Sequence, residues 1–92
     1  MKKKVPKSIP LPREITRGHL QDLWQQFHDA LRSDSTAIAL EAEQVERIDA
    51  PGLQLLLSVR KAADAKGSSV ILVDPSQVLR NSISLYRGEN LL

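Results

Sequence analysis

The stretch between residues 47 and 57 constrains the fold more than any other part of the chain. A strand-like pattern ends at Ile48, an acidic turn follows, and the next segment is rich in leucine and reads as a helix. Proline is favoured in the first turn of a helix because its missing N–H would have no partner there. An aspartate just before it can accept hydrogen bonds from the free N–H groups of that turn. We therefore predict a strand that passes into a helix at Pro51, with Asp49 or Ala50 as the N-cap.

Three strand-like segments alternate along the chain with three helix-like segments. The strand patterns fall at residues 8–11, 36–42 and 69–73, and the helix patterns fall at residues 17–32, 51–66 and 77–86. Such alternation is typical of α/β domains, in which right-handed crossovers build a largely parallel sheet. We predict a small mixed, largely parallel sheet of three to five strands with helices packed on it.

Two of the strands can be described further. The prolines around residues 8–11 limit that segment to a short edge strand, and no second full strand fits before the first helix. Residues 69–73 form a nearly continuous run of apolar, mostly β-branched side chains, which predicts a strand buried on both faces of the sheet. Gly67 precedes this strand and is a natural C-terminal cap for the second helix.

The first helix carries an apolar stripe at three- and four-residue spacing. The stripe consists of Leu20, Leu23, Trp24, Phe27, Ala30 and Leu31. Thr16 precedes the helix as a candidate N-cap. The stripe predicts that the helix packs on the sheet, and we expect Trp24 and Phe27 to lie in the core rather than to stack on a ligand.

Charge is distributed unevenly along the chain. Residues 1–13 contain five basic and no acidic side chains, whereas residues 14–92 contain eight basic and eleven acidic ones. We predict a flexible basic leader at residues 1–7 and a single folded domain at residues 8–92. The basic run is short and lacks aromatic residues, so we expect no nucleic-acid partner. No apolar run is long enough to cross a membrane and no signal-peptide pattern is present, which predicts a cytoplasmic protein.

The sequence offers few residues for catalysis or metal binding. There are no cysteines, and His19 and His28 stand nine positions apart, so they face different sides of a helix. Glu41, Glu43 and Glu46 lack a matching nucleophile and are interpreted as a solvated edge. A glycine-rich phosphate loop is absent from the sequence. We expect neither an enzyme nor a bound metal or cofactor.

The segments around the acidic turn resemble a known family. The end of a strand at residues 45–49, the turn at residues 50–52 and the apolar helix that follows resemble the core signature of the STAS domain. This is the domain of anti-sigma factor antagonists and of the cytoplasmic tails of sulfate transporters. Further similarity lies at residues 62–67, 70–75 and 85–88, and residues 11–16 resemble the start of short stand-alone members found beside bacterial chemotaxis genes. The resemblance covers about residues 8–92.

The resemblance implies a non-enzymatic module for protein–protein interaction. In regulatory members of the family a serine or threonine follows the aspartate of the turn. A partner kinase, itself the anti-sigma factor, phosphorylates this residue and thereby abolishes docking. Here Ala50 occupies that position and has no hydroxyl, and the next serine, Ser58, lies almost two turns into the helix. We therefore expect a docking surface without a phosphorylation site.

We expect the partner to bind at the turn and at the exposed face of the helix. The predicted partner-binding residues are Asp49, Ala50, Pro51, Gly52, Leu53 and Gln54. Asp49 would fix the turn, and the small residues after it would present a flat contact surface. The partner that the resemblance implies is a signalling protein, such as an anti-sigma factor or a histidine-kinase-like protein. The simpler alternative is that these residues only start the helix.

A second interpretation is an accessory STAS subunit of a membrane transport or lipid-trafficking ATPase complex. Some small STAS proteins are similar subunits bound to a transporter's ATPase, and the lysine-rich leader could then contact anionic lipid. Nucleotide binding has been associated with some STAS domains, but no residue of this chain indicates it. A role in transcription, in chemotaxis or in transport is compatible with the sequence. The sequence does not indicate whether the protein is a monomer or an oligomer.

Overall fold

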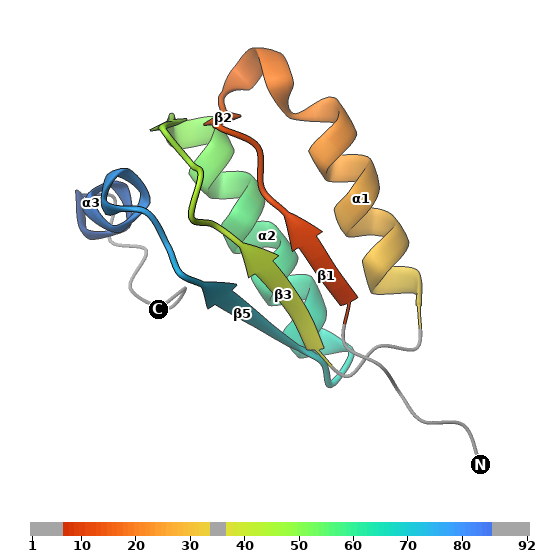
Figure 1. The fold of residues 1–92 in the computed structure, drawn as a ribbon. Helices are drawn as coiled ribbons and strands as arrows, with labels where there is room; N and C mark the ends of the chain where they lie inside the picture. The colour runs from red at the N-terminus through yellow and green to blue at the C-terminus, as the bar shows by residue number, and fades with distance from the viewer. Residues whose placement is uncertain (1–6, 34–36, 86–92) are drawn as a thin grey trace.

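A three-stranded parallel sheet forms the centre of the computed structural model, which describes residues 7–33 and 37–85 (Figure 1). Its strands are β1 (Lys7–Pro10), β3 (Ala37–Glu41) and β5 (Ser69–Val73), in the order β1-β3-β5. Both strand pairs are parallel, so the predicted α/β class with a largely parallel sheet is confirmed. Most of the predicted basic leader and the predicted helix end at Tyr86 lie outside the described residues.

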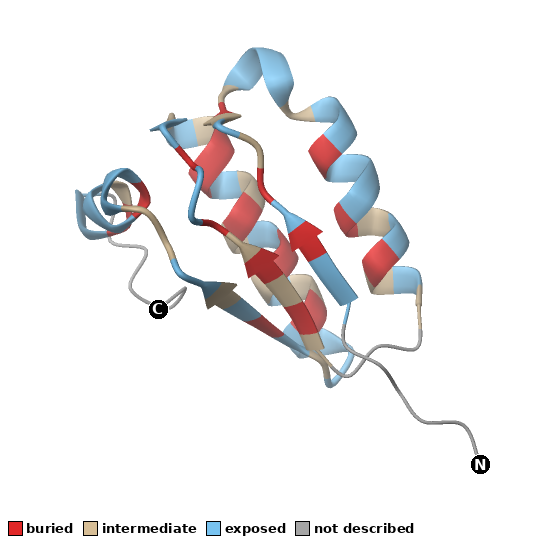
Figure 2. Ribbon diagram, in the orientation of Figure 1, coloured by how far each residue is buried: buried red, intermediate tan, exposed pale blue. Residues whose placement is uncertain are grey.

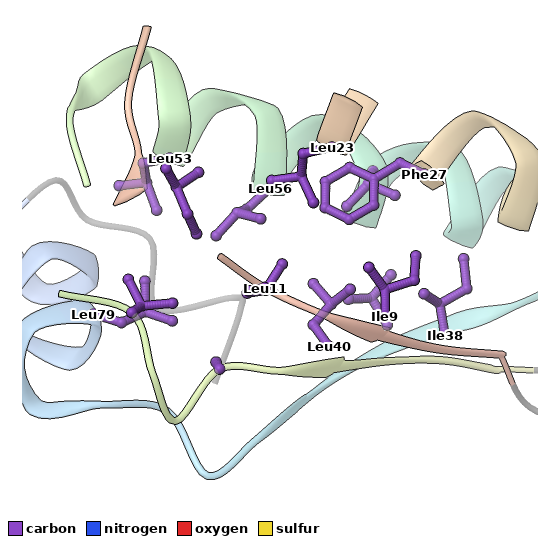
Figure 3. Close-up of a cluster of buried hydrophobic side chains, with 14 of the residues drawn as sticks. Ile9, Leu11, Leu23, Phe27, Ile38, Leu40, Leu53, Leu56 and Leu79 are labelled. Atoms are coloured by element: carbon purple, nitrogen blue, oxygen red, sulfur yellow. The ribbon is translucent and has the colours of Figure 1, made fainter. Parts of the chain in front are cut away.

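The helices are α1 (Gln21–Arg32), α2 (Ala50–Ala65) and α3 (Gln77–Leu85). α1 lies between β1 and β3 in the chain, and α2 lies between β3 and β5, so both connections step across the sheet in the same direction. Because parallel crossovers are right-handed, both helices fall on the same face of the sheet. Figure 3 shows this arrangement, with α1 and α2 on one side of the strands and the buried side chains between them.

The other face of the sheet is not covered by the described helices. Burial alternates along the strands (Figure 2), and in β5 Val70 is buried while Ile71 is 51% exposed and Val73 is 37% exposed. The prediction that residues 69–73 are buried on both faces is therefore wrong. The apolar run correctly indicated a parallel strand, but the same-side crossovers leave one face of that strand uncovered in the described part of the chain.

A second, very small sheet lies beyond the first one. β2 (Glu14–Ile15) and β4 (Arg47–Ile48) pair in parallel, with Ile15 opposite Ile48. α3 packs beside β4. β2 is only two residues long, which agrees with the prediction that no second full strand fits before the first helix.

The core fills the space between the main sheet and its two covering helices (Figure 3). The largest fully buried side chains are Leu11, Ile15, Leu23, Ile38, Leu40, Val45, Leu53, Leu56, Leu79 and Ile83. All are aliphatic, and they come from strands, helices and the connections between them. One continuous core of this kind is what holds α1 and α2 in fixed positions on the sheet.

Trp24 does not belong to this core. Phe27 is 2% exposed, as predicted, but Trp24 is 51% exposed, so its predicted place in the core is wrong. Adjacent residues of an α-helix are about 100° apart around its axis. The buried residues of α1 are Leu23, Phe27 and Ala30, and this leaves Trp24 on the flank of the stripe.

Two of the described helix ends follow local sequence signals, and a third does not. Gly67 follows α2 with a positive φ of 79°, the conformation expected of a glycine C-cap. Ser76 caps α3, because its Oγ accepts a hydrogen bond from the N–H of Leu79 at 3.1 Å. The exception is Thr16, which makes no side-chain cap hydrogen bond and precedes a short 3-10 helix, η1 (Arg17–His19), instead of α1 itself.

Candidate functional site

Asp49 lies at the junction of β4 and α2 and is held by hydrogen bonds in two directions. It is the N-cap of α2, and its Oδ1 accepts a hydrogen bond from the backbone N–H of Gly52 at 2.9 Å. Its Oδ2 accepts a second one from the backbone N–H of Arg17, also at 2.9 Å. The predicted capping role of Asp49 is confirmed, and Pro51 is the second residue of the helix rather than the first. One carboxylate thus joins the start of α2 to η1.

These hydrogen bonds stabilise the ionised form of the carboxyl group. The N–H of Arg17 has the largest effect and lowers the pKa of Asp49, and the N–H of Gly52 lowers it further. Desolvation opposes them, while the positive charge of Arg17 makes a smaller contribution in the lowering direction. The net result is a pKa below the usual value, so Asp49 is negatively charged at neutral pH. The positive end of the α2 dipole favours the same charge.

Gly52 brings the start of α2 into direct contact with β2. A Cβ atom on Gly52 would lie 1.9 Å from the carbonyl oxygen of Ile15, far inside any permitted contact. The same carbonyl accepts a hydrogen bond of 3.3 Å from the N–H of Asp49. Only glycine therefore fits at position 52, and the reason is space, not backbone conformation.

The six predicted partner-binding residues differ in exposure. Ala50 and Gln54 are exposed, Asp49 and Pro51 are half-buried, and Gly52 and Leu53 are buried. Ala50 and Gln54 are four residues apart and therefore lie on the same side of α2. Gly52 and Leu53 position this surface from behind, because the first contacts β2 and the second packs in the core.

Two contributors to the site were not found from the sequence, namely Ile15 and Arg17. Both act on the turn through backbone atoms, the carbonyl of Ile15 and the N–H of Arg17. Any residue type can supply such atoms, so no side-chain motif marks these positions. Only the pairing of β2 with β4 brings them to the turn.

Two further polar features near the turn are the hydroxyl of Ser58 and the ion pair between Arg47 and Glu14. The nearest serine on α2, Ser58, is exposed, and its Oγ donates a hydrogen bond to the carbonyl of Gln54 at 2.9 Å. Arg47 contacts Glu14 only loosely, at 3.9 Å between two exposed groups. Ion pairs of this kind contribute little to stability. The charged groups of Arg47 and Glu14 are therefore available to a partner.

The described part of the chain shows no arrangement of side chains that points to metal chemistry. Among residues 7–33 and 37–85, no group of three or more His, Cys, Asp or Glu side chains could hold a metal ion. Within these residues, every helix is too short or too polar to span a lipid bilayer.

The fold and the turn together define a small parallel α/β domain that presents an aspartate-capped helix start at its surface. The chain belongs to the STAS domain family, because the family model described as "Mlab, STAS domain" matches residues 4–92. The resemblance found in the sequence is thereby confirmed. A solved structure of the anti-sigma factor antagonist SpoIIAA in its unphosphorylated form is similar, with a TM-score of 0.77 and 21% sequence identity. The match covers 99% of this chain and 77% of that chain, and at this identity it establishes a shared fold. No curated protein sequence matches the chain.

Proposed function

We propose that this protein is a non-enzymatic regulatory module that docks a signalling protein through its Asp49 surface, defined as Asp49, Ala50, Pro51 and Gln54. The observation that carries the proposal is that the Asp49 carboxylate accepts two hydrogen bonds, one from the backbone N–H of Arg17 and one from that of Gly52. A surface that is already held in one conformation loses less entropy when a partner binds. Gly52 and Leu53 support the surface without being part of it.

Membership of the STAS family supports a signalling protein as the class of partner. The structurally similar SpoIIAA is an anti-sigma factor antagonist. We extend this to the present chain as a proposal: the partner is an anti-sigma factor, a histidine-kinase-like protein or a comparable signalling protein. Ala50 and Pro51 offer it a small apolar contact, and Gln54 offers a polar one on the next turn of the helix.

Ala50 determines how this interaction is regulated. It is the first residue of α2 and is exposed, so a serine or threonine there would be accessible to a kinase and a phosphate would be stabilised by the helix N-terminus. Alanine has no oxygen that can accept a phosphoryl group. Phosphorylation at position 50 therefore does not switch this docking surface off.

A pull-down with the tagged full chain tests the docking surface directly. The prey is the anti-sigma factor or histidine-kinase-like protein encoded nearest to this chain, and an ATPase subunit as a second prey tests the transport interpretation. The variant is Ala50→Asp, which places a negative charge on the contact surface but is compatible with the first turn of a helix. We expect capture to fall by about tenfold or more, because an uncompensated charge at an interface costs over ~1.4 kcal/mol.

The matched control is Gln77→Asp. Gln77 is the exposed first residue of α3, so this variant makes the same kind of change at the start of another helix. Capture by Gln77→Asp should equal that of the wild type. Equal capture by Ala50→Asp, with an unchanged circular dichroism spectrum, would show that the partner does not bind at the Asp49 surface.

A further inference from the structure

β5 forms one edge of the main sheet, and within the described part of the chain no strand pairs with its outer side. The strand order is β1-β3-β5, so β5 has β3 on one side only (Figure 1). Its other main contact is with α2, which covers one face of it, whereas α3 packs beside β4. The backbone groups along an unpaired edge can form hydrogen bonds with a further strand. The outer edge of β5 is therefore a surface on which a strand can dock.

The hydrogen bonds of β5 indicate which of its residues face outwards. The N–H of Ala42 donates a hydrogen bond of 3.0 Å to the carbonyl of Val73, so Val73 faces β3. Successive residues of a parallel strand form their hydrogen bonds on alternate sides of it. Ile71 therefore also faces β3, while Val70 and Leu72 direct their N–H and C=O groups to the outer edge. This edge offers an extended partner a regular row of donors and acceptors.

The opposite edge of the sheet, formed by β1, is protected against such pairing. The N–H of Leu11 donates a hydrogen bond of 2.9 Å to the carbonyl of Glu41, so Leu11 faces β3 and Pro10 occupies an outward-facing position. Proline has no N–H to offer there, and Lys7 adds a charge at the start of the strand. Prolines and lysines on edge strands prevent edge-to-edge association. β5 (Ser69–Val73) contains no proline, no glycine and no charged side chain.

The side chains along β5 are apolar on both faces of this edge. Ile71 and Val73 lie on the face of the sheet that the described helices leave uncovered, and Ile71 is half exposed. Leu72 lies on the helix side and packs against the core, but it is only half-buried. A strand placed beside β5 would cover part of each of these side chains. Pairing would thus bury apolar surface in addition to forming backbone hydrogen bonds.

A second copy of β5 fits this edge in the antiparallel direction. With a two-fold axis at Ile71, Val70 of one copy lies opposite Leu72 of the other, so the outward N–H and C=O groups of both strands are paired. Ile71 then lies opposite its own counterpart in a non-hydrogen-bonded pair, where cross-strand side chains are closest. Exposed Lys66 precedes the strand and exposed Asp74 follows it, so antiparallel pairing brings opposite charges together at each end. The strand is therefore complementary to itself.

We propose that the outer edge of β5 is a self-association surface, through which two copies of this chain pair their β5 strands antiparallel around Ile71. The two three-stranded sheets become one continuous sheet. The two-fold axis is perpendicular to that sheet, so the helices α1 and α2 of both copies lie on the same face. Such an interface is closed, since the same edge is used on both sides. The proposal goes beyond docking at the Asp49 surface and does not depend on it.

Sedimentation velocity of the full chain at low and high protein concentration tests the association. We expect the mass to rise from 10.2 kDa towards twice that value. Ile71→Lys should remain at the lower mass, because like charges directly opposite each other in a strand pair are unfavourable. Val78→Lys is the matched control, since it makes the same change at another exposed apolar residue, on α3, and it should associate like the wild type. Circular dichroism checks that both variants are folded.

Disulfide formation tests the register of the two strands. The chain contains no cysteine, so a single introduced thiol reports on one position. Cα atoms of a non-hydrogen-bonded antiparallel pair are about 4.5 Å apart, within the range of about 4.4–6.8 Å that a disulfide spans. We expect Ile71→Cys to give a covalent dimer when it is oxidised with diamide, and Val78→Cys, at an exposed position away from the edge, to remain a monomer.

Three results would overturn the proposal. A monomer at every concentration would show that the edge does not bind a second copy. Association that is unchanged in Ile71→Lys would assign the contact to another surface, and equal cross-linking of Ile71→Cys and Val78→Cys would show that the thiols meet only by random collision. These experiments use this chain alone, so their failure leaves the proposed docking at the Asp49 surface standing.

Discussion

The backbone N–H of Arg17 donates a hydrogen bond of 2.9 Å to Oδ2 of Asp49, although the two residues are 32 positions apart in the sequence. The other oxygen of the same carboxylate accepts a hydrogen bond from the N–H of Gly52. η1 and the start of α2 are therefore connected through one side chain. The shape of the proposed docking surface depends on the charge of that side chain, because both hydrogen bonds are stronger to a carboxylate than to a neutral group.

Replacing Asp49 with asparagine should lower stability at neutral pH, by an amount that decreases in acid. The N–H groups of Arg17 and Gly52 lower the pKa of Asp49 in the folded protein. A carboxyl group whose pKa is lower in the folded than in the unfolded state stabilises the fold above its unfolded pKa, and this contribution is lost as the pH falls through the folded pKa. The asparagine variant has no such group, so only the wild type loses stability in this way.

Urea unfolding of the wild type and of Asp49→Asn at several pH values measures this effect. The difference in midpoint should be constant between about pH 7 and about pH 5 and should narrow below about pH 5, where the unfolded carboxyl begins to take up protons. A difference that stays the same down to about pH 2 would show that the charge of Asp49 does not contribute to stability.

Substituting Gly52 with alanine should destabilise the protein by about 1–3 kcal/mol, the usual cost of forcing an atom into filled space. The new methyl group would meet the carbonyl oxygen of Ile15 at 1.9 Å, so α2 and β2 must move apart. Gly18→Ala is the matched control, because a Cβ atom there meets nothing within 4 Å, and it should change stability by no more than about 0.5 kcal/mol. Thermal or urea unfolding measures both. Equal stability of the two variants would contradict the close packing at Gly52.

The features predicted correctly from the sequence are those set by neighbouring residues. An aspartate two positions before a proline marks the start of α2, and the Asp49 cap follows from this short-range geometry. The alternation of strand and helix patterns is likewise local, and together with the handedness of crossovers it is sufficient for the parallel sheet.

The features that the sequence did not reveal are set by contacts between distant segments. The exposure of Ile71 depends on which face of the sheet the two crossover helices cover. The order of apolar residues along β5 does not indicate that face. The link between Arg17 and Asp49 uses a backbone N–H, which every residue except proline possesses. Trp24 lies on the edge of its stripe, where a rotation of the helix by a few tens of degrees decides between core and solvent.

Ala50→Ser should introduce a site for phosphorylation without disturbing the fold. Ala50 is exposed at the first position of α2, and serine is tolerated at the start of a helix. We expect intact-mass analysis after incubation with the kinase encoded nearest to this chain to show one added phosphate on the variant and none on the wild type. The phosphorylated variant should lose partner capture, since a phosphate adds about −1.5 to −2 charges. A phosphate on wild-type residues 49–58 would show that the surface has a modification site other than Ala50.

Truncating the two aromatic side chains of α1 should have very different effects on stability. Phe27→Ala removes a side chain that is 2% exposed and should cost about 3–5 kcal/mol, because it leaves a cavity between α1 and the sheet. Trp24→Ala removes a larger side chain that already lies half in solvent, and we expect it to cost about 1 kcal/mol or less, near the range for surface substitutions. Urea unfolding of both variants measures the difference. If Trp24→Ala destabilised the protein as much as Phe27→Ala, the indole would contribute to the core as much as the buried phenyl ring does, although half of it is exposed.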